Sequence, residues 1–191
     1  MPERDLGGHL LAVARHAIAS ELSQAMAAPE IVGALRQPGA TFVTLVCGEA
    51  LRGCIGSLKA TRAVGVDVRE NALAAAFRDP RFPPLTADEF SRTTIEVSLL
   101  SPPRIACFAS EAELCSRLVP GVDGVALELG DRRATFLPQV WEMLPEPREF
   151  VAALKAKAGF PADFWDTRLN VSLYRVTKWK ETESLPVQLS S

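Results

Sequence analysis

Apolar side chains recur along the first half of the chain at helical spacing, then at strand spacing, and then at helical spacing again. Over residues 6–27 they return every three or four positions, which predicts an amphipathic helix. Residues 41–47 instead alternate and are rich in β-branched side chains, and a Gly-Glu break joins them to residues 52–58, which predicts a hairpin. Helical spacing returns over residues 63–78 and ends before Pro80.

The second half of the chain continues this mixture, beginning with Thr86 and Glu89, which have the spacing of a capping box. Alternating apolar positions predict four more strands, and helical spacing predicts two more helices. The predicted strands are residues 93–100, 124–129, 132–137 and 170–179. The predicted helices are residues 110–118 and 148–158.

This order of elements favours one fold class. Strands joined by hairpins, with helices between the pairs, are typical of an α+β fold with largely antiparallel sheets and flanking helices, and not of a doubly wound parallel sheet. The 191 residues are 48% hydrophobic, which is enough for one well-buried core, and the sequence has no linker, repeat or low-complexity tract. We therefore predict a single compact domain over residues 1–191.

Composition and charge narrow the range of partners. With a net charge of −2 and dispersed Lys and Arg, the chain lacks the basic stripe that follows a phosphate backbone, which argues against nucleic acid. Its apolar runs fall far short of the ~20 residues of a membrane span, and its first residues do not form a secretory signal. Four irregularly spaced cysteines indicate thiols in a reducing cytoplasm, and two histidines without paired cysteine ligands argue against a metal site.

The segment Leu51-Arg52-Gly53-Cys54-Ile55-Gly56-Ser57-Leu58 is the most function-like feature of the sequence. In a strand, alternation places Arg52 and Cys54 on one face with their Cα atoms about 6.6 Å apart, where the guanidinium favours a thiolate. The flanking glycines allow a ligand or another backbone to approach closely. The alternative is that Cys54 is a small core residue and that the glycines only permit bulges or tight packing.

A carboxylate in the predicted strand 93–100 is the next candidate. Glu96 and Ser98 lie on the side opposite its apolar residues, where they would face a cleft together. The alternative is an ordinary solvated strand face. Both histidines lie in the N-terminal helix, and no motif links them to Cys54, so a Cys-His dyad is not favoured.

Two further candidates lie beside prolines. Residues 79–85 include three prolines, so this loop would present Arg81 on a stiff connection at the rim of a site. In the alternative, the first proline only ends a helix, and Phe82 fills the core. Pro138 begins a helical turn that leaves the amide of Gln139 able to reach a ligand, and a solvated glutamine is the alternative.

Four segments together resemble the AMMECR-domain family, whose bacterial and archaeal members are called AmmeMemoRadiSam system protein A. They are Leu51-Arg52-Gly53-Cys54-Ile55-Gly56, Asp79-Pro80-Arg81-Phe82-Pro83-Pro84-Leu85, Glu96-Val97-Ser98-Leu99-Leu100-Ser101-Pro102 and Leu137-Pro138-Gln139-Val140. The resemblance runs over nearly the whole chain. It implies a cytosolic α+β domain with two sub-regions built around antiparallel sheets, and no established biochemical activity.

The residues that the resemblance carries over are Arg52, Cys54, Glu96 and Gln139, followed by Arg81. The chain departs from the family pattern at one place. Where family members have a His-Gly pair, this sequence has Asp123-Gly124. An imidazole-based mechanism is not expected there, although a carboxylate can still act as a base or accept a hydrogen bond.

Two functional hypotheses follow from these residues and the resemblance. In the first, the chain is a binding or accessory component whose Arg52-Cys54 face forms a cleft; the system name implies a Memo-like protein and a radical S-adenosylmethionine enzyme as partners, and a small molecule is a further candidate ligand. In the second, Cys54 is the thiolate of an enzyme, Arg52 lowers its pKa, and Glu96 or Asp123 handles protons. Both hypotheses leave the cofactor and the substrate open.

Overall fold

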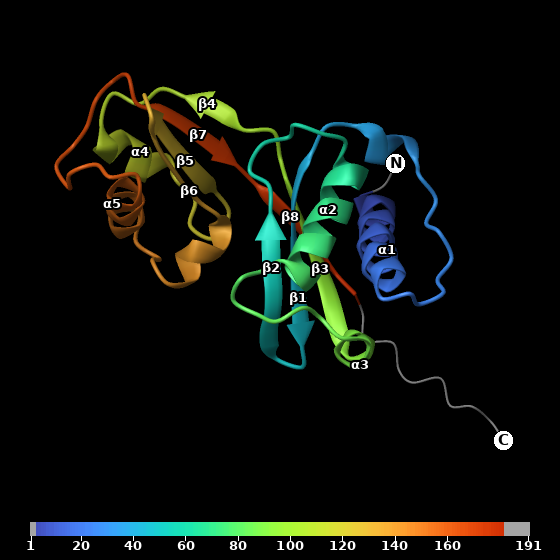
Figure 1. Ribbon diagram of the computed structural model, residues 1–191. Coiled ribbons are helices and arrows are strands. Elements are labelled where there is room, and N and C mark those ends of the chain that lie inside the picture. Colours follow the sequence, from blue (N-terminus) through green and yellow to red (C-terminus); the bar gives the residue numbers. More distant parts are fainter. Residues whose placement is uncertain (1–2, 182–191) are drawn as a thin grey trace. The chain divides into compact units, whose positions relative to one another are not determined.

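The computed structural model describes residues 3–181, and side chains from residue 6 onward. The described residues divide into two compact units (Figure 1), the first formed by residues 3–100 and 177–181 and the second by residues 101–176. Each unit contains one four-stranded antiparallel sheet with flanking helices. The predicted α+β fold class with two sub-regions is therefore confirmed. Within the described part, no helix combines the length and apolar character needed to cross a bilayer.

The first unit is a sheet with the strand order β2-β1-β3-β8. Its strands are β1 (Ala40–Cys47), β2 (Ala50–Gly56), β3 (Thr93–Leu100) and β8 (Val176–Lys180). Its helices are α1 (Glu3–Glu21), the 3-10 helix η1 (Gly33–Arg36), α2 (Val64–Phe77) and the short α3 (Ala87–Ser91). Helix α2 packs on β1 and β2, and α1 packs on α2 and β3 (Figure 1). Between helices and sheet lies an apolar core that includes Leu10, Ile18, Val43, Leu45, Val68, Ile95 and Val97.

The start of α2 is fixed to the β1–β2 hairpin by a buried carboxylate. Asp67 accepts hydrogen bonds from the Thr41 backbone N–H and hydroxyl (2.7 Å each), from the Ser57 hydroxyl (2.8 Å), from Arg62 Nε (2.8 Å) and from Asn71 Nδ2 (2.9 Å). A buried carboxylate with this many donors is compensated for its lost hydration. The network therefore sets where α2 meets the sheet.

The second unit has the strand order β4-β7-β5-β6. Its strands are β4 (Arg104–Ala106), β5 (Gly124–Leu129), β6 (Arg132–Phe136) and β7 (Asn170–Tyr174). Its helices are α4 (Glu111–Arg117), the 3-10 helix η2 (Pro138–Glu142) and α5 (Pro147–Lys157). In its core the rings of Trp141 and Phe150 stack at 3.8 Å. The fully buried Lys155 ammonium reaches Glu111 Oε2 and the Ala162 carbonyl at 2.5 Å, so this buried charge is paired.

Two predicted elements are wrong in their extent. Helix α1 ends at Glu21 and not at residue 27, because Ser23 adopts a positive φ of 56° that breaks the helix. The predicted strand 170–179 is two strands in different sheets, separated at Arg175, whose N–H donates to Ser101 Oγ and whose carbonyl accepts from Ser101 N–H. Uninterrupted alternation does not reveal that a chain has moved from one sheet to another.

Candidate functional site

Arg52 is the extra residue of a β-bulge. In the β1–β2 ladder Gly53 lies opposite Leu45, and Leu51 lies opposite Val46, so no β1 residue faces Arg52. The strict alternation that predicted a shared face for Arg52 and Cys54 therefore does not hold here.

The Arg52 guanidinium is committed to another partner. Its Nε and Nη2 donate to the carboxylate of Glu89 at 2.9 and 3.2 Å, and Nη2 also donates to the Pro83 carbonyl at 2.9 Å. Arg52 is only 7% exposed. Its hydrogen bonds hold the pKa of the Glu89 carboxyl at about 2, with the Thr86 backbone N–H as a second cause. Because Glu89 also completes the predicted capping box with Thr86, this ion pair joins β2 to the start of α3.

Asp79 holds the same strand at Cys54. β2 is an edge strand, and the Cys54 N–H donates to Asp79 Oδ2 at 2.9 Å, while the Cys54 carbonyl accepts from Arg81 Nη2 at 3.2 Å. Arg81 also donates to Asp79 through Nε (2.9 Å), Nη2 (2.7 Å) and its backbone N–H (3.1 Å). The loop therefore satisfies the outward backbone groups that an edge strand would leave unpaired.

The electrostatics of this contact follow from its hydrogen bonds. The Arg81 guanidinium holds the pKa of the Asp79 carboxyl well below its usual range, with the Cys54 N–H contributing in the same direction and burial opposing it. Asp79 in turn raises the pKa of Arg81, and the charge of a Cys54 thiolate acts in the same direction. The Arg81 side chain is 52% exposed, so its guanidinium lies beside Cys54 and also reaches solvent.

The Cys54 side chain belongs to a row that crosses the sheet. Cys54 lies opposite Thr44 in β1, and Thr44 lies opposite Glu96 in β3. The Thr44 hydroxyl donates to Cys54 Sγ at 3.3 Å, and Glu96 Oε1 pairs with Lys178 Nζ at 3.2 Å. Cys54 and Glu96 are thus brought into one row, but two strand spacings, about 9–10 Å, separate their backbones. Ser98 lies in the next row, opposite Phe42, and is buried.

Both glycines of the β2 segment are required by packing. A Cβ on Gly53 would lie 2.2 Å from the Ala75 carbonyl oxygen of α2, and one on Gly56 would lie 2.2 Å from the Phe42 ring. Two interpretations were left open for these glycines, access for a ligand or another backbone, and tight packing. Tight packing within the protein explains both positions.

The remaining predicted residues belong to the second unit. Asp123 is buried, accepts from the Val119 N–H at 2.8 Å, and lines a cavity of about 360 Å³ together with Arg104 and Arg175. Its backbone carbonyl accepts from Trp141 Nε1 at 2.7 Å. Gln139 lies in the first turn of η2 and is exposed. Asp123 is therefore fixed by local hydrogen bonds, while the Gln139 side chain faces solvent.

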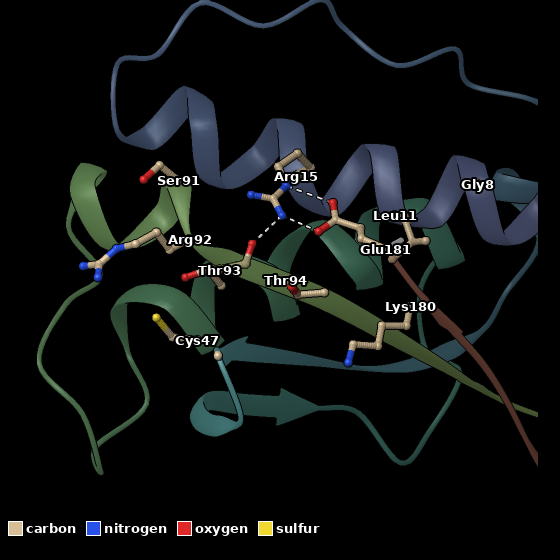
Figure 2. Close-up of a pocket in the computed structure, with 11 residues that line it drawn as sticks. Gly8, Leu11, Arg15, Cys47, Ser91, Arg92, Thr93, Thr94, Lys180 and Glu181 are labelled. Atoms are coloured by element: carbon tan, nitrogen blue, oxygen red, sulfur yellow. Dashed lines mark hydrogen bonds and ion pairs between the residues drawn. The ribbon is translucent and has the colours of Figure 1, made fainter. Parts of the chain in front are cut away.

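A separate polar cavity of about 1070 Å³ in the first unit includes none of the predicted residues. Figure 2 shows Arg15 reaching from α1 toward Glu181, with the Thr93 carbonyl beside them. Arg15 Nε donates to Glu181 Oε1 at 2.9 Å, and Arg15 Nη2 donates to the Thr93 carbonyl at 2.7 Å. Glu181 also accepts from the Ile95 N–H at 2.8 Å. This ion pair holds α1 and the end of the chain's described part against β3.

Asp79 was not predicted as a site residue, and Glu89 was predicted only as part of a helix cap. A signal for Asp79 was present, because an aspartate two positions before an arginine is suited to a local ion pair. Its bond to Cys54, 25 positions away, has no sequence signal. No group of three or more His, Cys, Asp or Glu side chains that could hold a metal ion occurs within residues 6–181, and the four cysteines are free thiols.

Comparison with known proteins gives a consistent result. A family model described as AMMECR1 matches residues 11–179. A protein of Methanothermobacter thermautotrophicus is 36% identical over 183 residues, covering 93% of this chain and 95% of the relative. One from Thermotoga maritima is 37% identical, covering 76% of this chain and 79% of the relative. The crystal structure of an uncharacterised protein from Pyrococcus horikoshii is similar with a TM-score of 0.78 and 30% identity, covering 93% of this chain and 92% of that one.

Proposed function

Because the chain belongs to the AMMECR1 family, we propose that it is a binding or accessory component of a pathway with a Memo-like protein and a radical S-adenosylmethionine enzyme. Its binding surface in this proposal is the Cys54 edge, which we define as Cys54, Arg81 and Phe82. The place of action is the cytoplasm, where the four free thiols of the chain would stay reduced.

One observation carries this proposal: in segments 51–56 and 79–85, which we call the two hallmark segments, the charged side chains are engaged in hydrogen bonds that fix the backbone. Arg52 is paired with Glu89, and Asp79 holds the Cys54 backbone. These bonds fix the backbone of a loop with three prolines, and they leave the Arg81 guanidinium half exposed beside the Phe82 ring, 5.5 Å from its centroid. A rigid arginine and an aromatic ring are the residue types that contribute most to protein interfaces, and rigidity lowers the entropy lost on binding.

The surroundings of the thiol support binding over catalysis. A nucleophilic cysteine needs a base within hydrogen-bond reach. The side chain that contacts Cys54 Sγ is Thr44, which donates a hydrogen bond to it. Glu96, the predicted base, lies one strand further and is engaged by Lys178. A base would therefore have to come from a bound partner or substrate.

The test is affinity capture from an extract of the native host, with the full chain as bait. We expect the parent to retain a Memo-like protein or a radical S-adenosylmethionine enzyme, and Arg81→Glu to lose it. Arg168→Glu is the matched control, because Arg168 forms the same kind of i, i+2 ion pair, with Asp166, in the second unit. Recovery of neither partner with the parent, or equal recovery with Arg81→Glu, would overturn the proposal.

The alternative is a Cys54-dependent enzyme acting on an unidentified substrate. The exposed Arg81 guanidinium beside Cys54 favours it, since a cation there can hold an anionic substrate next to the thiol. This hypothesis requires the thiol itself. A Cys54→Ser variant that folds normally and supports the parent's pathway flux would eliminate it and leave the binding role in place.

A further inference from the structure

An apolar cavity of about 640 Å³ lies in the first unit, away from the Cys54 edge. It is enclosed by the C-terminal half of α1, the segment 28–36 that includes η1, and the first half of α2. This volume is within the range of about 300–1,000 Å³ that is usual for small-molecule sites. The cavity shares no lining residue with the two hallmark segments or with the polar cavity of Figure 2.

The cavity has an apolar floor and an apolar rim. Ala17 and Leu35 are buried core residues that form part of its floor. Ile31 and Val66 also line it, and they are 52% and 50% exposed. Two exposed aliphatic residues around one hollow give a continuous apolar surface that a ligand would remove from water.

Two polar groups at the cavity have no hydrogen-bond partner within residues 6–181. His16 lines the cavity, and its Nδ1 is buried without a hydrogen-bond partner among the described residues, while its Nε2 lies 3.4 Å from Ser20 Oγ. A buried ring nitrogen left unpaired is rare and costly. Arg36 is exposed at the rim, and nothing in the described part of the chain forms a hydrogen bond or ion pair with its guanidinium.

Among the charged residues that line the cavity, Arg36 is the group that favours an anionic ligand. Arg69 also lines it but is engaged by Glu70 at 2.5 Å, and Glu21 is the one carboxylate among the lining residues. Because Glu70 neutralises Arg69, the lining keeps one guanidinium, that of Arg36, and one carboxylate, that of Glu21. The unpaired Arg36 presents a planar donor fork that matches a carboxylate.

We propose that this cavity binds a small molecule with an apolar body and a single carboxylate. The apolar body would lie against Ala17, Leu35 and Val66, and the carboxylate would pair with Arg36. The ring nitrogen of His16 would gain the hydrogen-bond partner that it lacks, either from the ligand or from a water molecule held by it. A linear fatty acid and an aryl carboxylate share this chemistry, and the experiment separates them.

The probe is dodecanoate, added below its micelle concentration to the full chain with isotope-labelled histidine rings. We expect saturable shifts of the His16 ring signals and no shift of the His9 signals, because His9 does not line the cavity. Arg36→Glu is expected to weaken binding about tenfold or more, since it replaces an attraction by a repulsion. Arg168→Glu, with an exposed arginine outside the cavity, is expected to bind like the parent.

Two further arms make the result decisive. Dodecylammonium, which has the same body and the opposite charge, is expected to bind about tenfold or more weakly than dodecanoate. A biphenyl carboxylate tests whether the ligand is an aryl carboxylate. Whichever of the two acids binds more tightly shows whether the cavity prefers a linear or an aryl apolar group. The proposal is overturned if neither acid saturates, if acid and ammonium bind alike, or if Arg36→Glu binds dodecanoate as the parent does.

Discussion

The chain contains the same local ion pair in two places, one in each unit. In Asp79-Pro80-Arg81 the arginine donates to the aspartate through Nε at 2.9 Å and Nη2 at 2.7 Å. In Asp166-Thr167-Arg168 the corresponding distances are 3.0 and 2.6 Å, and in both places the arginine N–H also binds the carboxylate. The pair thus forms wherever an Asp-x-Arg turn allows it, and by itself it indicates no function.

The two pairs differ in what else the carboxylate holds. The Asp79 side chain is 1% exposed and accepts a third type of bond, from the backbone N–H of Cys54 in another element. The Asp166 side chain is 22% exposed and that of Arg168 is 79% exposed. A solvated ion pair contributes little to stability, whereas a buried acceptor of a strand N–H cannot be lost without leaving that N–H unsatisfied. The hydrogen bond from Cys54 therefore gives the Asp79 turn a structural role that the Asp166 turn does not have.

The largest loss of stability is expected from removing the Asp79 carboxylate, and Asp166 is the control. Asp79→Ala leaves the Cys54 N–H without a partner, and we expect a loss of about 1–3 kcal/mol in the free energy of unfolding. Asp166→Ala is expected to leave the urea midpoint unchanged, because the Arg168 side chain that it binds is 79% exposed. Equal midpoints for the two variants in urea titrations would show that the Cys54 bond adds nothing and would remove the basis of the comparison.

The sequence predicted the local features of this region and missed the long-range ones. The hairpin, α2 and the Thr86 capping box were predicted because spacing and capping are local properties. The glycines of this segment permitted a bulge but did not locate it at Arg52, so the predicted neighbour of Arg52 was Cys54, while its partner in the structure is Glu89, 37 positions away. Contacts of this kind depend on how a loop returns to a strand edge, which one sequence does not encode in any periodicity.

The same limit applies to the other candidates. Alternation correctly placed Glu96 and Ser98 on one side of β3, and register then brought Glu96 into line with Cys54 through Thr44. The pairing of β1 with β3 was not predicted. The apolar cavity was not predicted either, because it is lined by α1, η1 and α2 residues whose helical patterns look like ordinary core. The single domain over residues 1–191 stays a prediction.

A smaller change in stability is expected when pH is lowered and the ion pair between Arg52 and Glu89 is lost. The folded pKa of Glu89 is about 2, below its ordinary value of 4.5, so its contribution to stability is present above the ordinary pKa and is lost as pH falls toward 2. In urea titrations, Glu89→Gln should therefore be less stable than the parent at pH 7 and approach it near pH 2.

The matched site for the pH experiment is Asp166, whose pKa is also lowered, to about 2, by the Arg168 side chain. Because that pair is solvated, salt should screen it, and Asp166→Asn should match the parent at high ionic strength across the pH range. A gap between parent and Glu89→Gln that does not narrow on acidification would contradict the ion pair's role in joining β2 to α3.

The smallest change in stability is expected from replacing the two arginines. It tests whether Arg81, unlike Arg168, contributes to holding the Cys54 backbone. Arg81→Ala leaves Asp79 in place to accept the Cys54 N–H but removes the donor to the Cys54 carbonyl. Since Arg81 is half exposed, we expect a cost well under about 1 kcal/mol, which corresponds to at most about a fivefold faster exchange of the Cys54 amide hydrogen if that amide opens locally. Arg168→Ala should leave this exchange unchanged. If Arg81→Ala also leaves it unchanged, Asp79 alone holds the strand edge, and the guanidinium is free to serve a partner.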